Sequence, residues 1–79
     1  MQFSKEDIWK MATRIDKIVE GSGMSRGEFA DMLGVKSCTL STWTGAHQIP
    51  SLPNLLAIAR FAGLTLDEMF EGILEVPQR

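Results

Sequence analysis

The chain has 79 residues, of which 44% are hydrophobic and 23% are charged, and its formal net charge is −2. That length allows one small hydrophobic core, and the composition is that of an ordinary folded domain, which excludes a fibrous or disordered chain. The chain has one cysteine and one histidine, too few for an internal disulfide or for a zinc site of about four Cys and His ligands. We therefore expect a single domain over residues 1–79, with no metal and no cofactor.

The first predicted helix begins after Ser4, a favourable N-cap residue that precedes acidic side chains in the first turn. Apolar residues then recur three or four positions apart, which places them on one helix face that must be buried. They are Ile8, Met11, Ala12, Ile15, Ile18 and Val19. Trp9 lies beside this face, so it is either at the edge of the core or part of a surface for a partner. The segment Gly21-Ser22-Gly23 ends the helix.

A second helix is expected after Ser25. Ser25 and Glu28 have capping-box spacing, in which each side chain accepts a hydrogen bond from the backbone amide of the other residue. The buried side of this helix would consist of Phe29, Ala30 and Leu33. Gly34 would end it, because glycine readily adopts the left-handed conformation found just after a helix.

A short third helix is predicted next, with Ser37 as a candidate N-cap and Gly45 at its end. Leu40 and Trp43 are three positions apart and therefore share one side of this helix. The remaining positions are mostly Ser and Thr, which are poor helix formers. These small polar residues are either a solvated surface or a surface kept for contact with a DNA groove.

Two prolines in residues 48–53 predict a turn, after which Ser51 is the N-cap of a fourth helix and Pro53 lies in its first turn. The apolar residues of this helix are Leu52, Leu55, Leu56, Ile58, Ala59 and Ala62. Thr65 and Glu68 have capping-box spacing and open a fifth helix. Its apolar residues are Leu66, Met69, Phe70, Ile73 and Leu74. The predicted fold is therefore all-α, with five helices around one core.

The spacing within residues 26–43 is that of a helix-turn-helix. This motif needs a small residue where its two helices touch and a glycine at the turn, and Ala30 and Gly34 meet these needs. The second helix must be anchored by apolar residues so that its outer side stays free for the major groove of DNA. The anchoring residues would be Val35, Leu40 and Trp43. The motif as predicted covers about residues 25–45.

Several segments in and around this motif resemble the DNA-binding domain of phage Cro and lambda-type repressors, the XRE family. They are Met24-Ser25-Arg26-Gly27-Glu28-Phe29-Ala30-Asp31-Met32-Leu33-Gly34-Val35, then Leu40, Trp43 and Gly45, then Ile49-Pro50-Ser51 and Leu55-Leu56, and finally Leu64-Thr65-Leu66-Asp67-Glu68-Met69-Phe70. The similarity covers about residues 8–72 and includes the elements that flank the motif. It implies a five-helix lambda-repressor-like domain that binds double-stranded DNA.

The resemblance also implies which residues meet DNA, with the helix over residues 37–44 as the recognition helix. Base edges would be contacted by Ser37, Cys38 and Thr42. Phosphates would be contacted by Arg26, Lys36, Thr39, Ser41 and His47. Many family members carry Gln, Asn or Arg on this helix, which bind adenine or guanine through two hydrogen bonds. The small side chains found here predict readout through water and thymine-methyl contacts.

A dimer contact is predicted in the C-terminal helix and tail, about residues 65–79. Ile73, Leu74 and Val76 are more apolar residues than the core of so small a domain can easily hold, which favours a two-fold homodimer. Such a dimer would match a palindromic operator with half-sites one helical turn apart. We therefore predict a sequence-specific transcriptional regulator, a dimeric repressor of prophage or bacterial origin.

Two alternatives remain open. The acidic net charge and the small side chains of the recognition helix also suit a protein-interaction module with weak or no DNA binding. An antitoxin-type regulator would instead bind a protein partner through its C-terminal surface. The excess of acid lies in residues 61–79, where four acidic side chains accompany Arg79, so the rest of the surface can still face DNA. Cys38 is either a redox sensor or a small polar group.

An enzyme is not expected, because His47 lies in a predicted loop without a partner that could position it as a catalytic base. Arg60 interrupts the longest apolar stretch, which leaves no segment of the roughly 20 apolar residues that cross a membrane. The first residues also lack the pattern of a secretory signal. These features predict a cytoplasmic protein that does not bind membranes.

Overall fold

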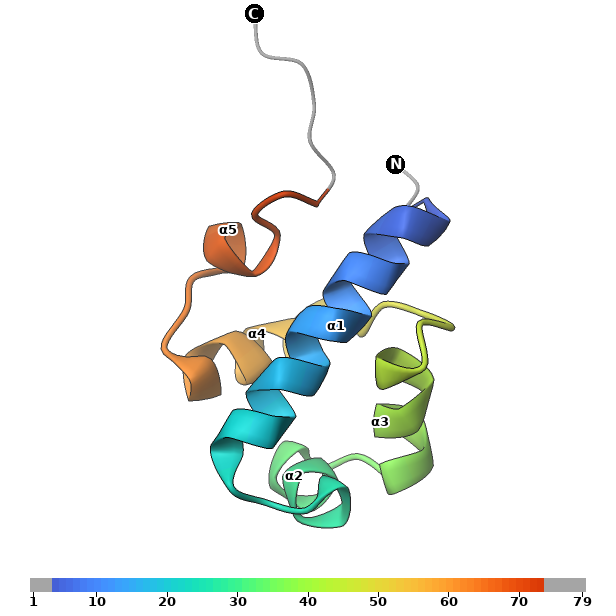
Figure 1. Ribbon diagram of the computed structural model, residues 1–79. Coiled ribbons are helices and arrows are strands. Elements are labelled where there is room, and N and C mark those ends of the chain that lie inside the picture. The colour runs from blue at the N-terminus through green and yellow to red at the C-terminus, as the bar shows by residue number, and fades with distance from the viewer. Residues whose placement is uncertain (1–3, 74–79) are drawn as a thin grey trace, which may run out of the picture.

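The computed structural model describes residues 4–73 and contains five helices and no strand within that range (Figure 1). The helices are α1 (Lys5–Ser22), α2 (Arg26–Leu33), α3 (Ser37–Thr44), α4 (Leu52–Ala62) and α5 (Leu66–Met69). In Figure 1, α1 runs across the front of the molecule, with α3 on its right and α5 on its left. The predicted all-α architecture with five helices is confirmed.

Capping boxes close the N-terminal ends of α1, α2 and α5. In each one a hydroxyl accepts a hydrogen bond from the amide three residues later, and the carboxylate of that later residue accepts one from the N-cap amide. The pairs are Ser4 with Asp7, Ser25 with Glu28, and Thr65 with Glu68. Ser51 is the N-cap of α4, with Pro53 in its first turn. The N-caps predicted for these four helices are confirmed.

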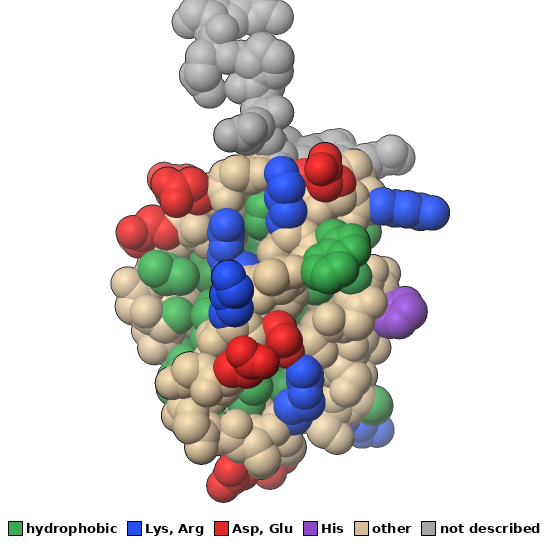
Figure 2. All heavy atoms as spheres, viewed as in Figure 1, with side chains coloured by type: hydrophobic (Ala, Val, Ile, Leu, Met, Phe, Trp, Pro, Cys, Tyr) green, Lys and Arg blue, Asp and Glu red, His purple; other side chains and the backbone are tan. Residues whose placement is uncertain are grey.

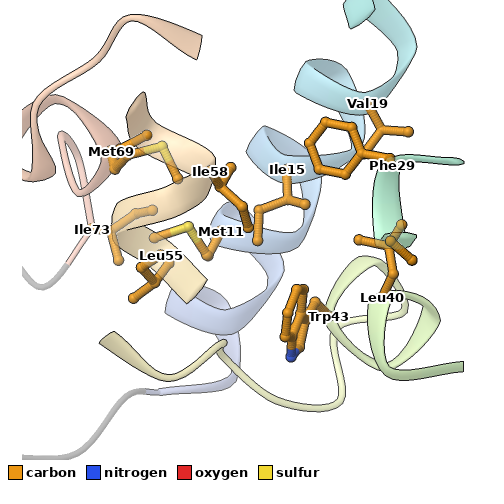
Figure 3. Close-up of a cluster of buried hydrophobic side chains, with 12 residues drawn as sticks. Met11, Ile15, Val19, Phe29, Leu40, Trp43, Leu55, Ile58, Met69 and Ile73 are labelled. Carbon is orange, nitrogen blue, oxygen red and sulfur yellow. The ribbon is translucent and has the colours of Figure 1, made fainter. Parts of the chain in front are cut away.

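The core lies where the five helices meet. Figure 3 shows Ile15 of α1 between Trp43 of α3 and Ile58 of α4, and all three side chains are at most 2% exposed. The buried cluster consists of Met11, Ile15, Val19, Phe29, Ala30, Leu40, Trp43, Leu55, Ile58, Ala59, Met69 and Ile73. The ring of Phe29 also meets that of Phe61 edge to face, with their centroids 5.3 Å apart. One hydrophobic cluster therefore holds α2 and α3 to α1 and α4.

α5 is shorter than the sequence predicted. It ends at Met69, and residues 70–72 form turns instead of continuing the helix. Arg14 of α1 explains this end, because its Nη1 donates hydrogen bonds to the carbonyls of Met69, at 2.7 Å, and Glu71, at 2.9 Å. These bonds satisfy carbonyl groups that a longer helix would have paired internally.

Leu52 is the second departure from prediction. It is 62% exposed, because it is the first residue of α4 and precedes by almost a full turn the position at which Leu55 enters the core. Leu55, Ile58 and Ala59 are buried as predicted. The core-facing side of α4 is therefore narrower than its composition indicated.

Candidate nucleic-acid interface

The turn between α2 and α3 is a Schellman motif. Gly34 has a left-handed φ of 77°, and its amide donates to the carbonyl of Asp31 while the amide of Val35 donates to that of Ala30, both at 3.0 Å. Ala30 is 1% exposed. A small residue at the contact between the helices and a glycine at the turn thus occupy the positions that the sequence predicted.

α3 is amphipathic in an unusual way, with two large side chains inward and small polar ones outward. Leu40 and Trp43 are 0% and 2% exposed, and Val35 packs against the same cluster. These are the predicted anchoring residues. The outer side carries Ser37, Cys38 and Ser41, all exposed, with Thr42 and Thr39 half-buried at its edges. Among residues 4–73, nothing covers this outer side.

The predicted base-contacting residues share that outer side. The Thr42 hydroxyl donates to the Cys38 carbonyl at 3.0 Å, so its hydrogen is used within the helix while its lone pairs and methyl group remain available. Cys38 is exposed and free. Ser37 is not the N-cap that its position suggested, because the helix already starts at Ser37 and Lys36 occupies the N-cap position.

The N-terminal end of α3 is open. No side chain caps it, in contrast to the capping boxes of α1 and α2. Lys36, at the N-cap position, is exposed. An uncapped helix N-terminus with an exposed lysine favours an anion, because the free amides and the helix dipole both carry partial positive charge. The predicted phosphate contact of Lys36 is thus geometrically available.

The C-terminal end of α3 is held close to the following loop. A Cβ on Gly45 would lie 2.9 Å from the Ser41 carbonyl oxygen and 3.1 Å from the His47 ring, so only glycine fits there without movement. The His47 amide donates to the Thr42 carbonyl at 3.1 Å, and the His47 side chain is exposed. Gly45 therefore lets His47 fold back beside the outer side of α3.

Arg26, the other predicted phosphate ligand, is engaged inside the domain. Its Nη2 lies 2.6 Å from Asp16 Oδ1 of α1, and its Nη1 donates to Thr44 Oγ1 of α3 at 2.8 Å. The ion pair is exposed, with 49% of the Arg26 side chain and 36% of the Asp16 side chain accessible. Sequence reasoning missed Asp16. It lies ten positions before Arg26 and on a different helix, so no local spacing connects the two residues.

The residues predicted to form a dimer contact divide into two groups. Ile73 is 3% exposed and belongs to the core, so the view that the core has no room for it is wrong. Leu74 and Val76 lie outside the described residues. Trp9, whose position the sequence left open, is 65% exposed and is therefore a surface residue.

The described residues show two further features that bear on function. None of their helices is both long and apolar enough to span a bilayer. No group of three His, Cys, Asp or Glu side chains among them is placed to hold a metal ion.

Two helices joined by this turn, the second anchored by Leu40 and Trp43 and free on its outer side, define a helix-turn-helix. The family model described as helix-turn-helix matches residues 15–69, which is well over half of the chain. The chain belongs to this family, and its domain is of the DNA-binding type found in phage Cro and lambda-type repressors. Such domains serve transcription regulators and are not catalytic. Comparison with curated proteins and with solved structures gave no match.

Proposed function

We propose that this protein is a sequence-selective repressor that binds duplex DNA as a homodimer. It would be cytoplasmic and encoded by a bacterium or a prophage. The observation that carries the proposal is the outer side of α3. Ser37, Cys38 and Ser41 are exposed there, while Leu40 and Trp43 fix the helix to the core from beneath. An anchored helix with a free polar side is what entry into a major groove requires.

Small side chains would let the backbone of α3 approach the base edges closely. Because the Thr42 hydroxyl already donates within the helix, it meets bases as an acceptor or through its methyl group. Suitable partners are the amino groups of adenine and cytosine and the methyl group of thymine. Cys38 and Ser37 add short polar groups, so much of the readout passes through bridging water.

Phosphate contacts would come from the edges of the same surface. Lys36 and the open N-terminus of α3 form one anion-binding position. His47, exposed beside the C-terminal end of α3, offers a ring N–H that can donate a hydrogen bond to a second phosphate. Arg26 can contact a phosphate only when its ion pair with Asp16 is broken. So few cations per subunit give weak non-specific binding, and two subunits on one operator are needed for useful affinity.

Fluorescence anisotropy with mixed-sequence duplexes at two or more salt concentrations tests DNA binding. The expected result is an affinity that falls steeply as salt rises, because each neutralised phosphate contributes about −0.9 to the slope of log K against log salt. Lys36→Ala should lower affinity for every sequence and reduce that slope by about 1. An affinity that is absent at low salt would favour a protein-interaction module over a repressor.

Selection of bound fragments from random duplexes then tests sequence selectivity. Thr42→Val keeps the shape and one methyl group but removes the oxygen. It should therefore change the free-energy difference between the preferred base and the others at one position by about 1–3 kcal/mol. Thr44→Val is the control for base preference, because Thr44 is half-buried and its hydroxyl accepts a hydrogen bond from Arg26, so this variant can change the affinity for every sequence but not the preferred base. Identical selected sequences for the wild type and Thr42→Val would contradict the proposed orientation of α3.

A further inference from the structure

A groove runs along the surface between α1 and the segment that contains α5. In Figure 1, α5 and α3 lie on opposite sides of α1. It is open to solvent and has a volume of about 910 Å³. Ile18 and Leu64 contribute apolar surface to it, and Trp9 also lines it. None of its lining residues is among those predicted to contact DNA.

The charges of the groove are divided between its two walls. Figure 2 shows Lys and Arg side chains following one another along α1, with acidic side chains beside them over α5. The α1 wall includes Lys5, Lys10, Arg14 and Lys17, with Glu6 as its one acid among the lining residues. The opposite wall includes Glu68 and Glu71 and no cation. The groove therefore has a basic wall and an acidic wall.

Much of this charge has no partner within the described part of the chain. Arg14 and Lys10 are occupied, since Arg14 donates to the Met69 carbonyl at the end of α5 and Lys10 donates to the Gly72 carbonyl in the turn that follows. Lys5 and Lys17 make no hydrogen bond or ion pair among residues 4–73, and neither does the Glu71 carboxylate. Free charges of both signs thus remain on opposite walls.

The presence of one basic and one acidic wall favours some binding partners over others. A nucleic acid or an acidic peptide would bind the basic wall but would be repelled by Glu68 and Glu71. A basic partner would meet the opposite problem. A second copy related by a two-fold axis that runs parallel to the groove places the basic wall of each protomer against the acidic wall of the other, so both walls are matched at once.

Trp9 supplies the apolar contact that such an interface needs. It is 65% exposed and is therefore available to a partner. A tryptophan that becomes buried in an interface is among the residues that contribute most to its affinity. α1 extends over 18 residues, or about 27 Å at a rise of roughly 1.5 Å per residue. A surface of that length can contribute much of the ~800 Å² that each partner of a standard interface buries.

We propose that the groove between α1 and α5, with Trp9 at its centre of contact, is the homodimer interface of this protein. This rests on the proposed function, which requires a dimer, and it places the interface on α1 instead of on the C-terminal tail. Because α3 lies on the other side of α1 (Figure 1), both recognition helices stay uncovered in the dimer.

The two tryptophans provide a direct test, because Trp43 is buried and Trp9 is exposed in the monomer. Acrylamide quenching of the full chain, without DNA, should report one accessible tryptophan at nanomolar concentration. At high micromolar concentration that tryptophan should become protected, at the same concentrations at which sedimentation detects a dimer. A dimer whose Trp9 stays open to acrylamide would overturn the proposal, and so would a monomer at every concentration.

Variants test the groove itself. Trp9→Ala should raise the dimer dissociation constant by roughly 30-fold or more, as for an interface residue that contributes at least ~2 kcal/mol. Leu52→Ala is the matched control, because Leu52 is 62% exposed but lies on α4, and it should leave the constant unchanged. Circular dichroism establishes that both variants fold. Equal dimerisation of the two variants would overturn the proposal.

Charge reversal tests the pairing of the walls. Lys17→Glu and Glu71→Lys should each weaken the homodimer, because each places a like charge against the facing wall where an opposite charge stood. An equimolar mixture of the two variants should restore a heterodimer, in which opposite walls face each other. Failure of the mixture to associate would count against the groove as the interface.

The outcome is separable from that of the proposed function, since DNA binding is measured by anisotropy and dimerisation without DNA. Salt-dependent DNA binding by a chain that never protects Trp9 would leave the repressor proposal intact and remove this interface. A protected Trp9 without DNA binding would support this interface and remove the repressor proposal.

Discussion

Arg26 Nη2 and Asp16 Oδ1 lie 2.6 Å apart, so the arginine that we propose as a phosphate contact is already paired with a carboxylate of its own chain. The same guanidinium donates to Thr44 Oγ1 at 2.8 Å. Arg26 thereby connects α1, α2 and α3, and it helps to set the orientation of the two motif helices relative to α1. A DNA phosphate must compete with Asp16 for it.

Replacing Asp16 should strengthen DNA binding. Asp16→Asn removes the competing negative charge, so Arg26 becomes free for phosphate and a source of repulsion disappears. We expect non-specific affinity at low salt to rise roughly 3- to 10-fold, with a salt slope steeper by up to about 1 per subunit. Stability should change by no more than about 1 kcal/mol, because the ion pair is exposed.

Asp31→Asn is the matched control for this measurement. It changes the net charge equally, but the exposed Asp31 side chain has no hydrogen bond or ion pair among residues 4–73. Anisotropy titrations that give the same gain for both variants would show a general charge effect and not release of Arg26.

The turn of the motif should tolerate asparagine better than alanine at position 34. A Cβ on Gly34 meets no atom within 4 Å, so the cost is only that of holding an L-residue at φ 77°. Gly34→Ala should lose about 1–2 kcal/mol of folding stability, which lowers Tm by roughly 4–8 °C per kcal/mol in a domain of this size. Gly34→Asn should lose less, because asparagine visits this conformation more readily. Equal thermal midpoints for Gly34→Ala and the wild type would contradict this assignment of strain.

Arg14 should be needed to order the end of α5. Arg14→Met keeps the length of the side chain but removes the hydrogen bonds to the Met69 and Glu71 carbonyls. We expect a loss of about 1–2 kcal/mol in urea unfolding and faster amide exchange at Ile73, whose side chain is buried. The stability and exchange rate of Arg14→Lys should lie between those of the wild type and Arg14→Met, because an ammonium group is a more compact donor than the planar guanidinium. Unchanged exchange at Ile73 in Arg14→Met would show that core packing alone holds this segment.

The N-terminus of α2 should respond to acid through Glu28. The Ser25 backbone amide donates to the Glu28 carboxylate at 2.9 Å, and with the Ser25 side chain it lowers the pKa of Glu28 below its ordinary value of 4.5. Because the folded pKa is depressed, the stabilisation is complete above the unfolded pKa and is lost as pH falls through the folded one.

A carboxyl-detected NMR titration measures this directly. The Glu28 midpoint in the folded chain should lie below its midpoint in the urea-unfolded chain, and the Ser25 amide proton should shift with it. Glu28→Gln keeps an acceptor for the capping box but cannot titrate, so the Ser25 shift should disappear in that variant. A folded midpoint equal to or above the unfolded one would contradict the capping-box effect.

Local features of the sequence were enough to predict most of the helices and the motif. Ser25 with Glu28 and Thr65 with Glu68 start their helices as predicted, because capping depends on groups only three residues apart. Leu40 and Trp43 proved to be the buried side of α3, because helical periodicity alone puts them on one face. These properties were accessible because near neighbours in the chain decide them.

The tertiary structure decided what depends on distant segments. Arg14 reaches carbonyls 55 and 57 residues later, at the end of the four-residue α5, and no local spacing indicates that contact. Asp16 meets Arg26, and Ile73 enters the core while Trp9 stays outside, only because helix packing sets which faces meet. Periodicity states which residues share a face, but the packing of several helices determines which faces are covered.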